Sequence, residues 1–148
     1  MMIFTFNEYN GDSLKYARAC AKYFLGRDVH ISYYGSGKPF IVGEDAFISI
    51  SHTGHDLVIA VSNQEVGIDI ENKKYRHYES IAKRFFGNDK TINDINDFYR
   101  EWTRYEAQYK HGGDNGVFYS IDIFEEVILT VYSSDIEYIF IPMQNILN

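Results

Sequence analysis

Two acidic residues in the middle of the chain have a spacing that suits metal chemistry. Residues 66–71 read Val-Gly-Ile-Asp-Ile-Glu, so apolar residues alternate with a glycine and two acids. Strand side chains alternate between two faces, which places Asp69 and Glu71 on one face, roughly 7 Å apart. Neighbouring carboxylates repel each other unless a positive charge lies between them, and Mg²⁺ takes oxygen ligands. The pattern predicts a strand with a candidate metal site; the alternative is a half-exposed strand with two solvated acids.

A predicted helix from about residue 94 to 111 carries a third acid. Trp102, Glu106 and Lys110 are spaced four residues apart, so they form one row along the helix. Glu106 then lies one turn from a cation and one turn from a large aromatic side chain. An ordinary surface Glu–Lys pair is the alternative. The apolar stripe of this helix is expected to contain Ile95, Phe98, Trp102 and Tyr109.

Two short segments could bind an anion. Residues 35–39 read Gly-Ser-Gly-Lys-Pro, a flexible loop that holds Lys38 beside the rigid Pro39. The spacing is not that of a Walker loop, and an ordinary turn is the alternative. Ser51 and His52 are neighbours at a predicted strand end, so they face apart and do not form a nucleophile–base dyad. His52 could donate to a phosphate, or it could be a surface histidine in a turn.

Composition restricts the functional class. The 148 residues carry a net charge of -7, which argues against a general nucleic-acid binder. One cysteine, Cys20, cannot form an internal disulfide, which is compatible with a reducing cytoplasm. Neither a signal peptide nor a membrane-spanning run is recognised, so a cytoplasmic protein without membrane contact is expected. A basic run stands out on this acidic chain; it comprises Lys73, Lys74, Arg76, Lys83 and Arg84. It could receive an acidic partner, or be a solvated face.

The predicted elements suggest an α+β fold. Strands are expected at residues 2–6, 30–34, 46–51, 56–62 and 66–71, then at 117–124, 126–132 and 136–142. Helices are expected from Asp12 to Gly26, from about residue 81 to Gly87, and from Asp94 to His111. Each half of the chain thus combines strands with a helix. We expect two similar α+β lobes, residues 1–65 and 66–148, that meet near residue 66.

Read in order, these blocks resemble a known family. The sequence contains Gly-Lys-Pro at 37–39, Ile-Ser-Ile-Ser-His at 48–52, Gly-Ile-Asp-Ile-Glu at 67–71 and Arg-Phe-Phe at 84–86. Trp-Thr-Arg-Tyr-Glu-Ala-Gln-Tyr-Lys follows at 102–110. Over roughly residues 12–125 the chain resembles the 4′-phosphopantetheinyl transferase superfamily, in its larger surfactin-synthetase-activating class. The 66 residues before Gly67 resemble that pseudo-dimeric class rather than the small trimeric holo-acyl-carrier-protein synthases. The resemblance implies two α/β lobes related by a pseudo-twofold axis in a monomer, with one active site between the lobes.

The resemblance also implies an activity. Such enzymes move the phosphopantetheine arm of coenzyme A onto a serine of an apo acyl or peptidyl carrier protein and release 3′,5′-ADP. Mg²⁺, with Mn²⁺ as an alternative, would be held by Asp69, Glu71 and Glu106. Glu106 or Glu71 would accept the serine proton, and Glu106 is the preferred candidate.

The resemblance extends to residues that would hold coenzyme A. Lys110 would pair with a phosphate of coenzyme A and contribute to catalysis. Lys38 and His52, with their neighbours Pro39 and Ser51, would hold the 3′-phosphate or the pyrophosphate. The basic run would lie near the carrier protein, whose recognition surface in this family is acidic.

Several positions depart from the family pattern. Tyr105 stands where a lysine is frequent, Ser49 where an asparagine is frequent, and Asp89 near a position where glutamate is common. The chain is also short for this class. Two other functions therefore remain open: a non-catalytic relative that binds coenzyme A or a carrier protein, and a Mg²⁺-dependent phosphate-ester hydrolase.

Overall fold

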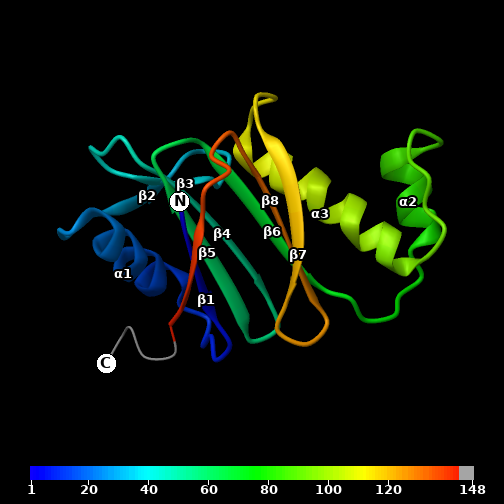
Figure 1. Cartoon of the computed structure of the whole chain (residues 1–148), viewed down its shortest axis with the longest axis horizontal. Helices are drawn as coiled ribbons and strands as arrows, with labels where there is room; N and C mark the ends of the chain where they lie inside the picture. The colour runs from blue at the N-terminus through cyan, green and yellow to red at the C-terminus, as the bar shows by residue number, and fades with distance from the viewer. Residues whose placement is uncertain (144–148) are drawn as a thin grey trace.

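Two β-sheets that lie side by side form the frame of the computed structural model, which describes residues 1–143 (Figure 1). The first sheet has the strand order β4-β5-β1-β9 and the second the order β6-β8-β7. The first contains β4 (Phe47–Thr53), β5 (Asp56–Ser62), β1 (Met2–Phe6) and β9 (Ile139–Pro142). The second contains β6 (Val66–Asn72), β8 (Val127–Ser133) and β7 (Val117–Ile123). All pairs are antiparallel except β1 with β9. The chain is a mixed α/β structure, as predicted.

Helix α1 (Ser13–Leu25) packs against the first sheet. Its N-terminus is capped by Asp12, whose carboxylate accepts a hydrogen bond from the Lys15 backbone N–H. Gly26 ends the helix in the left-handed conformation, with φ 73°. The buried face of the helix joins β1, β4 and β5 in one apolar core. A small hairpin of β2 (Ile31–Tyr33) and β3 (Pro39–Ile41) flanks this unit. Strand β3 was not predicted, because the preceding glycines suggested only a loop.

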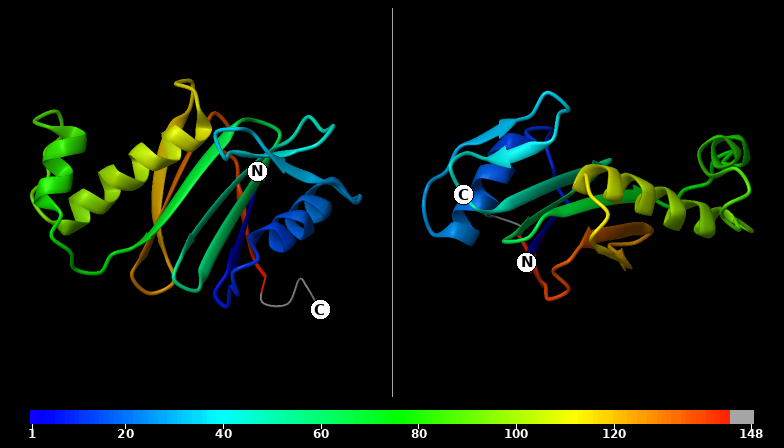
Figure 2. Two further views of the ribbon diagram at one scale, coloured as in Figure 1. Left: turned by 180° about the vertical axis from the view of Figure 1, so that it is seen from behind. Right: turned by 90° about the horizontal axis from the view of Figure 1, so that it is seen from above.

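Helix α3 (Ile95–His111) lies against β6 and β8, and α2 (Glu79–Phe86) packs on its first turns. Figure 2 shows α2 at the far end of the molecule, away from the first sheet. Asp94 caps α3 through the Asp97 backbone N–H, and Gly112 ends it. Among residues 1–143, no helix is both long and apolar enough to cross a lipid bilayer.

The predicted apolar stripe of α3 is wrong at one position. Tyr109 is 71% exposed, whereas Tyr99, Thr103, Ala107 and His111 form the buried row. This row faces the second sheet, where the Thr103 hydroxyl lies 2.6 Å from the Thr130 hydroxyl of β8. Helix and sheet approach so closely that small and polar side chains line the contact, and a hydrophobicity pattern does not reveal such a face.

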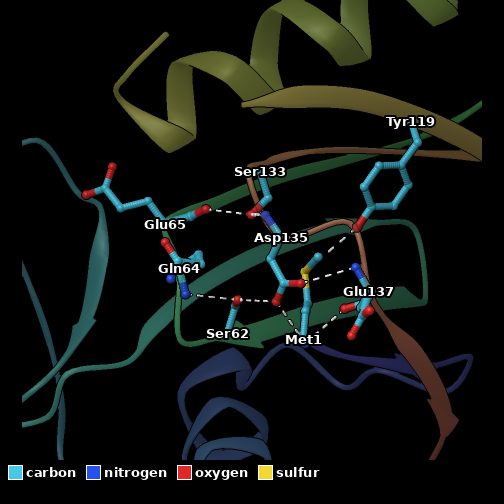
Figure 3. A network of polar contacts seen from close by, with 8 residues as sticks. All are labelled: Met1, Ser62, Gln64, Glu65, Tyr119, Ser133, Asp135 and Glu137. Atoms are coloured by element: carbon cyan, nitrogen blue, oxygen red, sulfur yellow. Dashed lines mark hydrogen bonds and ion pairs between the residues drawn. The ribbon is translucent and has the colours of Figure 1, made fainter. Parts of the chain in front are cut away.

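A polar network links the two sheets near the N-terminus (Figure 3). The Asp135 carboxylate accepts hydrogen bonds from the Met1 amino group and the Ser62 hydroxyl, each at 3.0 Å. The Ser133 hydroxyl donates to the Glu65 carbonyl at 2.7 Å. Strand β9 also pairs with β1, so the chain returns to the first sheet after completing the second. The division into lobes at residues 65 and 66 stays a prediction.

Gly67 is the point of closest approach between α3 and β6. A Cβ atom at this position would lie 1.9 Å from the Ala107 carbonyl oxygen and 2.6 Å from the His111 backbone nitrogen. Both obstacles are helix backbone, so the helix would have to move away from the strand. We therefore predict that Gly67→Ala lowers the free energy of unfolding by about 2–3 kcal/mol in urea titrations.

Gly35→Ala is the matched control for this substitution. Gly35 lies in an exposed turn, and a methyl group added there would have no atom within 4 Å, so the change in stability is expected to stay within about 0.5 kcal/mol. Equal stabilities of the two variants would refute the proposed close contact.

Candidate active site

Strand β6 directs its acidic residues toward α3. Val66, Ile68 and Ile70 are buried in a core with β1, β5 and β8, which confirms the predicted alternation. Asp69 and Glu71 therefore lie on the opposite face, beneath the helix that carries Glu106 and Lys110. The fold places Glu106 within electrostatic range of Asp69, although the two acids are separated by 37 residues in the sequence.

Asp69 is the most buried of the three acids, with 6% of its surface exposed. Its Oδ1 atom accepts hydrogen bonds from the Lys110 Nζ at 3.0 Å and from the Ser51 Oγ at 3.2 Å. Its Oδ2 atom is buried and has no partner among residues 1–143. Lys110 also reaches the Ile50 carbonyl of β4, at 3.5 Å. One lysine of α3 thus contacts both β4 and β6.

Burial raises the pKa of Asp69 to about 6, although the positive charge of Lys110 acts in the opposite direction. The negative charges of Glu71 and Glu106 raise this pKa further. Burial also raises the pKa of Glu71, although the positive charges of Arg76 and Lys110 act in the opposite direction. The carboxylates repel one another in a poorly solvated space, and a cation placed among them would relieve this repulsion.

A cleft of about 470 Å³ opens beside Lys110. Among the predicted site residues it is lined by Lys38, Pro39, Glu106 and Lys110. Tyr109, Ser49 and the turn at residues 36–37 complete much of its wall. A second cleft of about 420 Å³ lies between α3 and β7, around Lys73 and Arg100, and contains none of the predicted site residues.

Lys38 joins the loop before β3 to the end of α3. Its Nζ donates to the His111 carbonyl at 2.9 Å and lies 3.9 Å from the Glu65 carboxylate. A lysine at this position also interacts favourably with the negative end of the helix dipole. The contact holds the Gly-Lys-Pro turn against α3 and so forms one wall of the cleft.

Ser51 and His52 point to opposite sides of β4, as predicted. Ser51 is 5% exposed and faces Asp69. His52 is exposed, lies with its ring 5.3 Å from the Tyr9 ring, and does not line the cleft. Strand β4 continues to Thr53, two residues beyond the end of the predicted strand 46–51, so the turn begins at Gly54.

The metal site is not assembled in this structure. Among residues 1–143, no three His, Cys, Asp or Glu side chains are gathered closely enough to hold an ion. The donor set nevertheless fits a hard cation, because the buried Oδ2 of Asp69 has no partner among residues 1–143 and the carboxylates of Glu71 and Glu106 lie within electrostatic range of Asp69. Glu71 and Glu106 are only half-buried, so their side chains have room to turn toward it.

The predicted basic run is divided. Lys73 pairs with Asp122 of β7 at 2.9 Å, and 22% of its side chain is exposed. The other four members lie exposed on or before α2; they are Lys74, Arg76, Lys83 and Arg84.

Sequence reasoning also missed the buried hydroxyl cluster of Thr103, Thr130 and Ser120, which joins α3, β8 and β7. The available signal in the sequence was Thr103, which lies four residues from the buried Tyr99 and four from the buried Ala107 on α3.

The raised pKa of Asp69 predicts a pH-dependent stability difference. Because the folded state favours the protonated carboxyl, this group stabilises the fold below its unfolded pKa near 3.8, and the contribution is lost as pH rises through about 6. Asp69→Asn removes the cost of ionising a buried carboxyl group. The free energy of unfolding of the variant, relative to that of the native chain, is therefore expected to rise by about 2 kcal/mol from pH 4.5 to pH 8. Urea unfolding at both pH values measures this change.

Asp45→Asn controls for the loss of one negative charge at an exposed position. If the free energies of unfolding of Asp69→Asn and Asp45→Asn change with pH in the same way, burial does not raise the pKa of Asp69.

Four curated relatives that match the chain are named as 4′-phosphopantetheinyl transferases. The chain is 35% identical over 124 residues to the 4′-phosphopantetheinyl transferase Sfp of Bacillus subtilis strain 168, which covers 77% of the chain and 54% of the relative. It is 32% identical, with the same coverage, to the transferase ffp of Bacillus subtilis. It is 34% identical over 96 residues to the transferase gsp of Aneurinibacillus migulanus, covering 60% of the chain and 39% of the relative.

No family model matches the sequence. The chain spans about half the length of the first two curated relatives. Each of these matches carries the same family name, which agrees with the family that the sequence blocks resemble. The comparisons therefore support the 4′-phosphopantetheinyl transferase superfamily for this chain.

Proposed function

We propose that the protein transfers 4′-phosphopantetheine from coenzyme A to a serine hydroxyl of an apo acyl or peptidyl carrier protein. The names of its relatives support the reaction class. The observation that carries the proposal is the contact between Asp69 of β6 and Lys110 of α3, next to a cleft that Glu106 and Lys38 line. This arrangement combines carboxylates, two lysines and a space for a phosphate-bearing substrate.

The proposed reaction is a substitution at phosphorus. The serine oxygen forms a bond to the phosphorus atom that carries the pantetheine arm, and the bond from that phosphorus to the bridging pyrophosphate oxygen breaks. The leaving group is 3′,5′-ADP, which takes the electron pair of the broken bond. The serine proton passes to a carboxylate, directly or through a water molecule. Glu106 is the preferred acceptor because it lines the cleft, and Glu71 is the alternative.

Asp69, Glu71 and Glu106 would hold the divalent ion. When bound, Mg²⁺ neutralises the pyrophosphate oxygens and stabilises charge that develops on the leaving group. Mn²⁺ takes similar oxygen ligands and is an alternative. The chain's own contribution is to keep these acids in a partly dry space, where their mutual repulsion favours binding of a cation.

Two lysines of the cleft would hold phosphate groups. Lys110 stands between Asp69 and the cleft, so its ammonium group can pair with a phosphate while it remains near the acids. Lys38 also lines the cleft, next to Pro39. His52 would contribute only if coenzyme A extends beyond the cleft along β4. Tyr105 packs against the Phe85 ring and supplies no charge at a position where the family resemblance implies a lysine.

The exposed basic residues around α2 would receive the carrier protein. Lys74, Arg76, Lys83 and Arg84 present positive charge on a chain with a net charge of -7. An acidic partner surface would be attracted there and steered toward the acids of β6. We further propose a cytoplasmic monomer with the site between two pseudo-symmetric lobes, 1–65 and 66–148, as in the larger class of this family.

The proposed reaction predicts a defined mass change on the carrier. With coenzyme A and Mg²⁺, an apo carrier protein is expected to gain about 340 Da in intact-mass spectrometry, as group transfer from coenzyme A requires. Asp69→Ala should abolish this gain, because a hard-cation site loses one of three anionic ligands.

The same assay separates the alternatives. Coenzyme A binding without a mass gain across a panel of apo carriers would indicate a non-catalytic relative. Release of 4′-phosphopantetheine without a carrier would indicate a hydrolase. Either result would contradict the proposed transfer.

Lys110→Ala is predicted to weaken coenzyme A binding by at least about tenfold, because a partly buried cation would no longer pair with a phosphate. Isothermal calorimetry with coenzyme A and Mg²⁺ measures the dissociation constant. Lys90→Ala is the control, since Lys90 is half-exposed and pairs with Glu101 at 3.5 Å, outside the cleft. If the two variants bound coenzyme A with equal affinity, Lys110 would not pair with a phosphate group.

A further inference from the structure

Strands β4 and β6 are neighbours that belong to different sheets. They lie in close contact, but β4 forms its backbone ladder with β5, and β6 with β8. Two serine side chains of β4 fill the space between them. The Ser49 Oγ accepts a hydrogen bond from the Ile68 N–H at 3.1 Å, and the Ser51 Oγ accepts one from the Ile70 N–H at 3.0 Å. The junction of the two sheets is therefore made by hydroxyl groups.

The two serines are alike in position and burial but differ in one contact. Ser49 is 3% exposed and Ser51 5% exposed, and they lie on the same face of β4. Only Ser51 also approaches a carboxylate, donating its hydroxyl proton to Asp69 Oδ1 at 3.2 Å. Because a hydroxyl has a single proton, the bond from Ile70 leaves the Ser51 proton free to point at Asp69.

This contact determines which oxygen of Asp69 is free. Oδ1 accepts from Ser51 and Lys110, whereas Oδ2 is buried without a partner among residues 1–143. Both donors to Oδ1 are themselves tied to β4, Ser51 by its backbone and Lys110 by the Ile50 carbonyl. Rotation of the carboxylate would break these bonds, so Oδ2 keeps its direction.

We propose that Ser51 is a positioning residue that orients Asp69, so that Oδ2 is presented as the ligand for a divalent cation. The inference rests on the proposed function and assigns Ser51 a role other than direct contact with coenzyme A. Groups that hydrogen-bond a metal-binding carboxylate set its orientation, and their loss weakens metal binding 10- to 100-fold in known sites. Ser49, which bonds only backbone, has no such effect.

The test compares Ser51→Ala with Ser49→Ala. Each variant loses one hydroxyl acceptor for a β6 N–H, so the two should lose similar stability in urea unfolding. Mn²⁺ is titrated into each protein, and the free ion is followed by electron paramagnetic resonance. We expect the dissociation constant for Mn²⁺ to rise at least about tenfold in Ser51→Ala. In Ser49→Ala it should stay within about twofold of the native protein's value.

Ser51→Cys provides a second variant if Ser51→Ala does not fold. It keeps most of the side-chain volume but offers only a weak donor, so Mn²⁺ binding should weaken in the same direction. Ser51→Thr retains the hydroxyl and should bind Mn²⁺ within about threefold of the native protein. The role of Ser51 would be overturned if Ser51→Ala bound Mn²⁺ as tightly as Ser49→Ala does. If Ser51→Ala does not fold, the same comparison is made with Ser51→Cys.

The outcomes separate this inference from the proposed function. If the native protein binds Mn²⁺ and modifies a carrier while the variants of Ser51 and Ser49 bind Mn²⁺ equally, only the positioning role fails. If the native protein binds neither Mn²⁺ nor Mg²⁺, the metal site of the proposed function fails, and the positioning role fails with it.

Discussion

The approach of α3 to β6 at Gly67 is the constraint on which the rest of the site depends. A side chain at this position would collide with the helix backbone, so the glycine allows helix and strand to lie closer than ordinary residues permit. The buried face of α3 accordingly carries alanine and threonine opposite the sheet. At this short separation Lys110 reaches Asp69, and Glu106 comes within electrostatic range of the β6 acids.

The junction of the two sheets adds a second element to the site. Hydroxyl groups of β4 bond to the backbone of β6, and Lys110 contacts both strands. The same contacts leave one carboxylate oxygen of Asp69 buried and, within residues 1–143, unpaired. The contacts that hold β4 against β6 can therefore also orient Asp69 as a metal ligand. Lys38, bonded to the last carbonyl of α3, forms part of the cleft wall.

Burial and charge oppose each other at the centre of the site. Asp69 is held in a space that disfavours its ionised form, and Lys110 is the cation that contacts it. Such an arrangement costs stability, because a solvated or apolar residue would fit the fold more easily, and groups of this kind cluster at functional sites. The unfavourable environment of the carboxyl group is what a cation would relieve on binding.

Much of the local structure follows from short-range rules that the sequence states directly. Asp12 and Asp94 cap the first and third helices, Gly26 and Gly112 end them, and the alternation at 66–71 makes a strand with two acids on one face. The spacing of Glu106 and Lys110 along one helix is equally local. These features depend on neighbours within a few residues, so they can be read without knowledge of the fold.

Tertiary structure alone decided which of these residues meet. Ser51 was expected beside a phosphate but bonds Asp69, and Tyr109 was expected in the core but lines the cleft. Both outcomes depend on the separation of elements that are distant in the sequence, and no pattern within a single element encodes that separation. The sequence determined the chemical groups and the faces on which they lie, whereas packing at Gly67 and between β4 and β6 decided the distances between them.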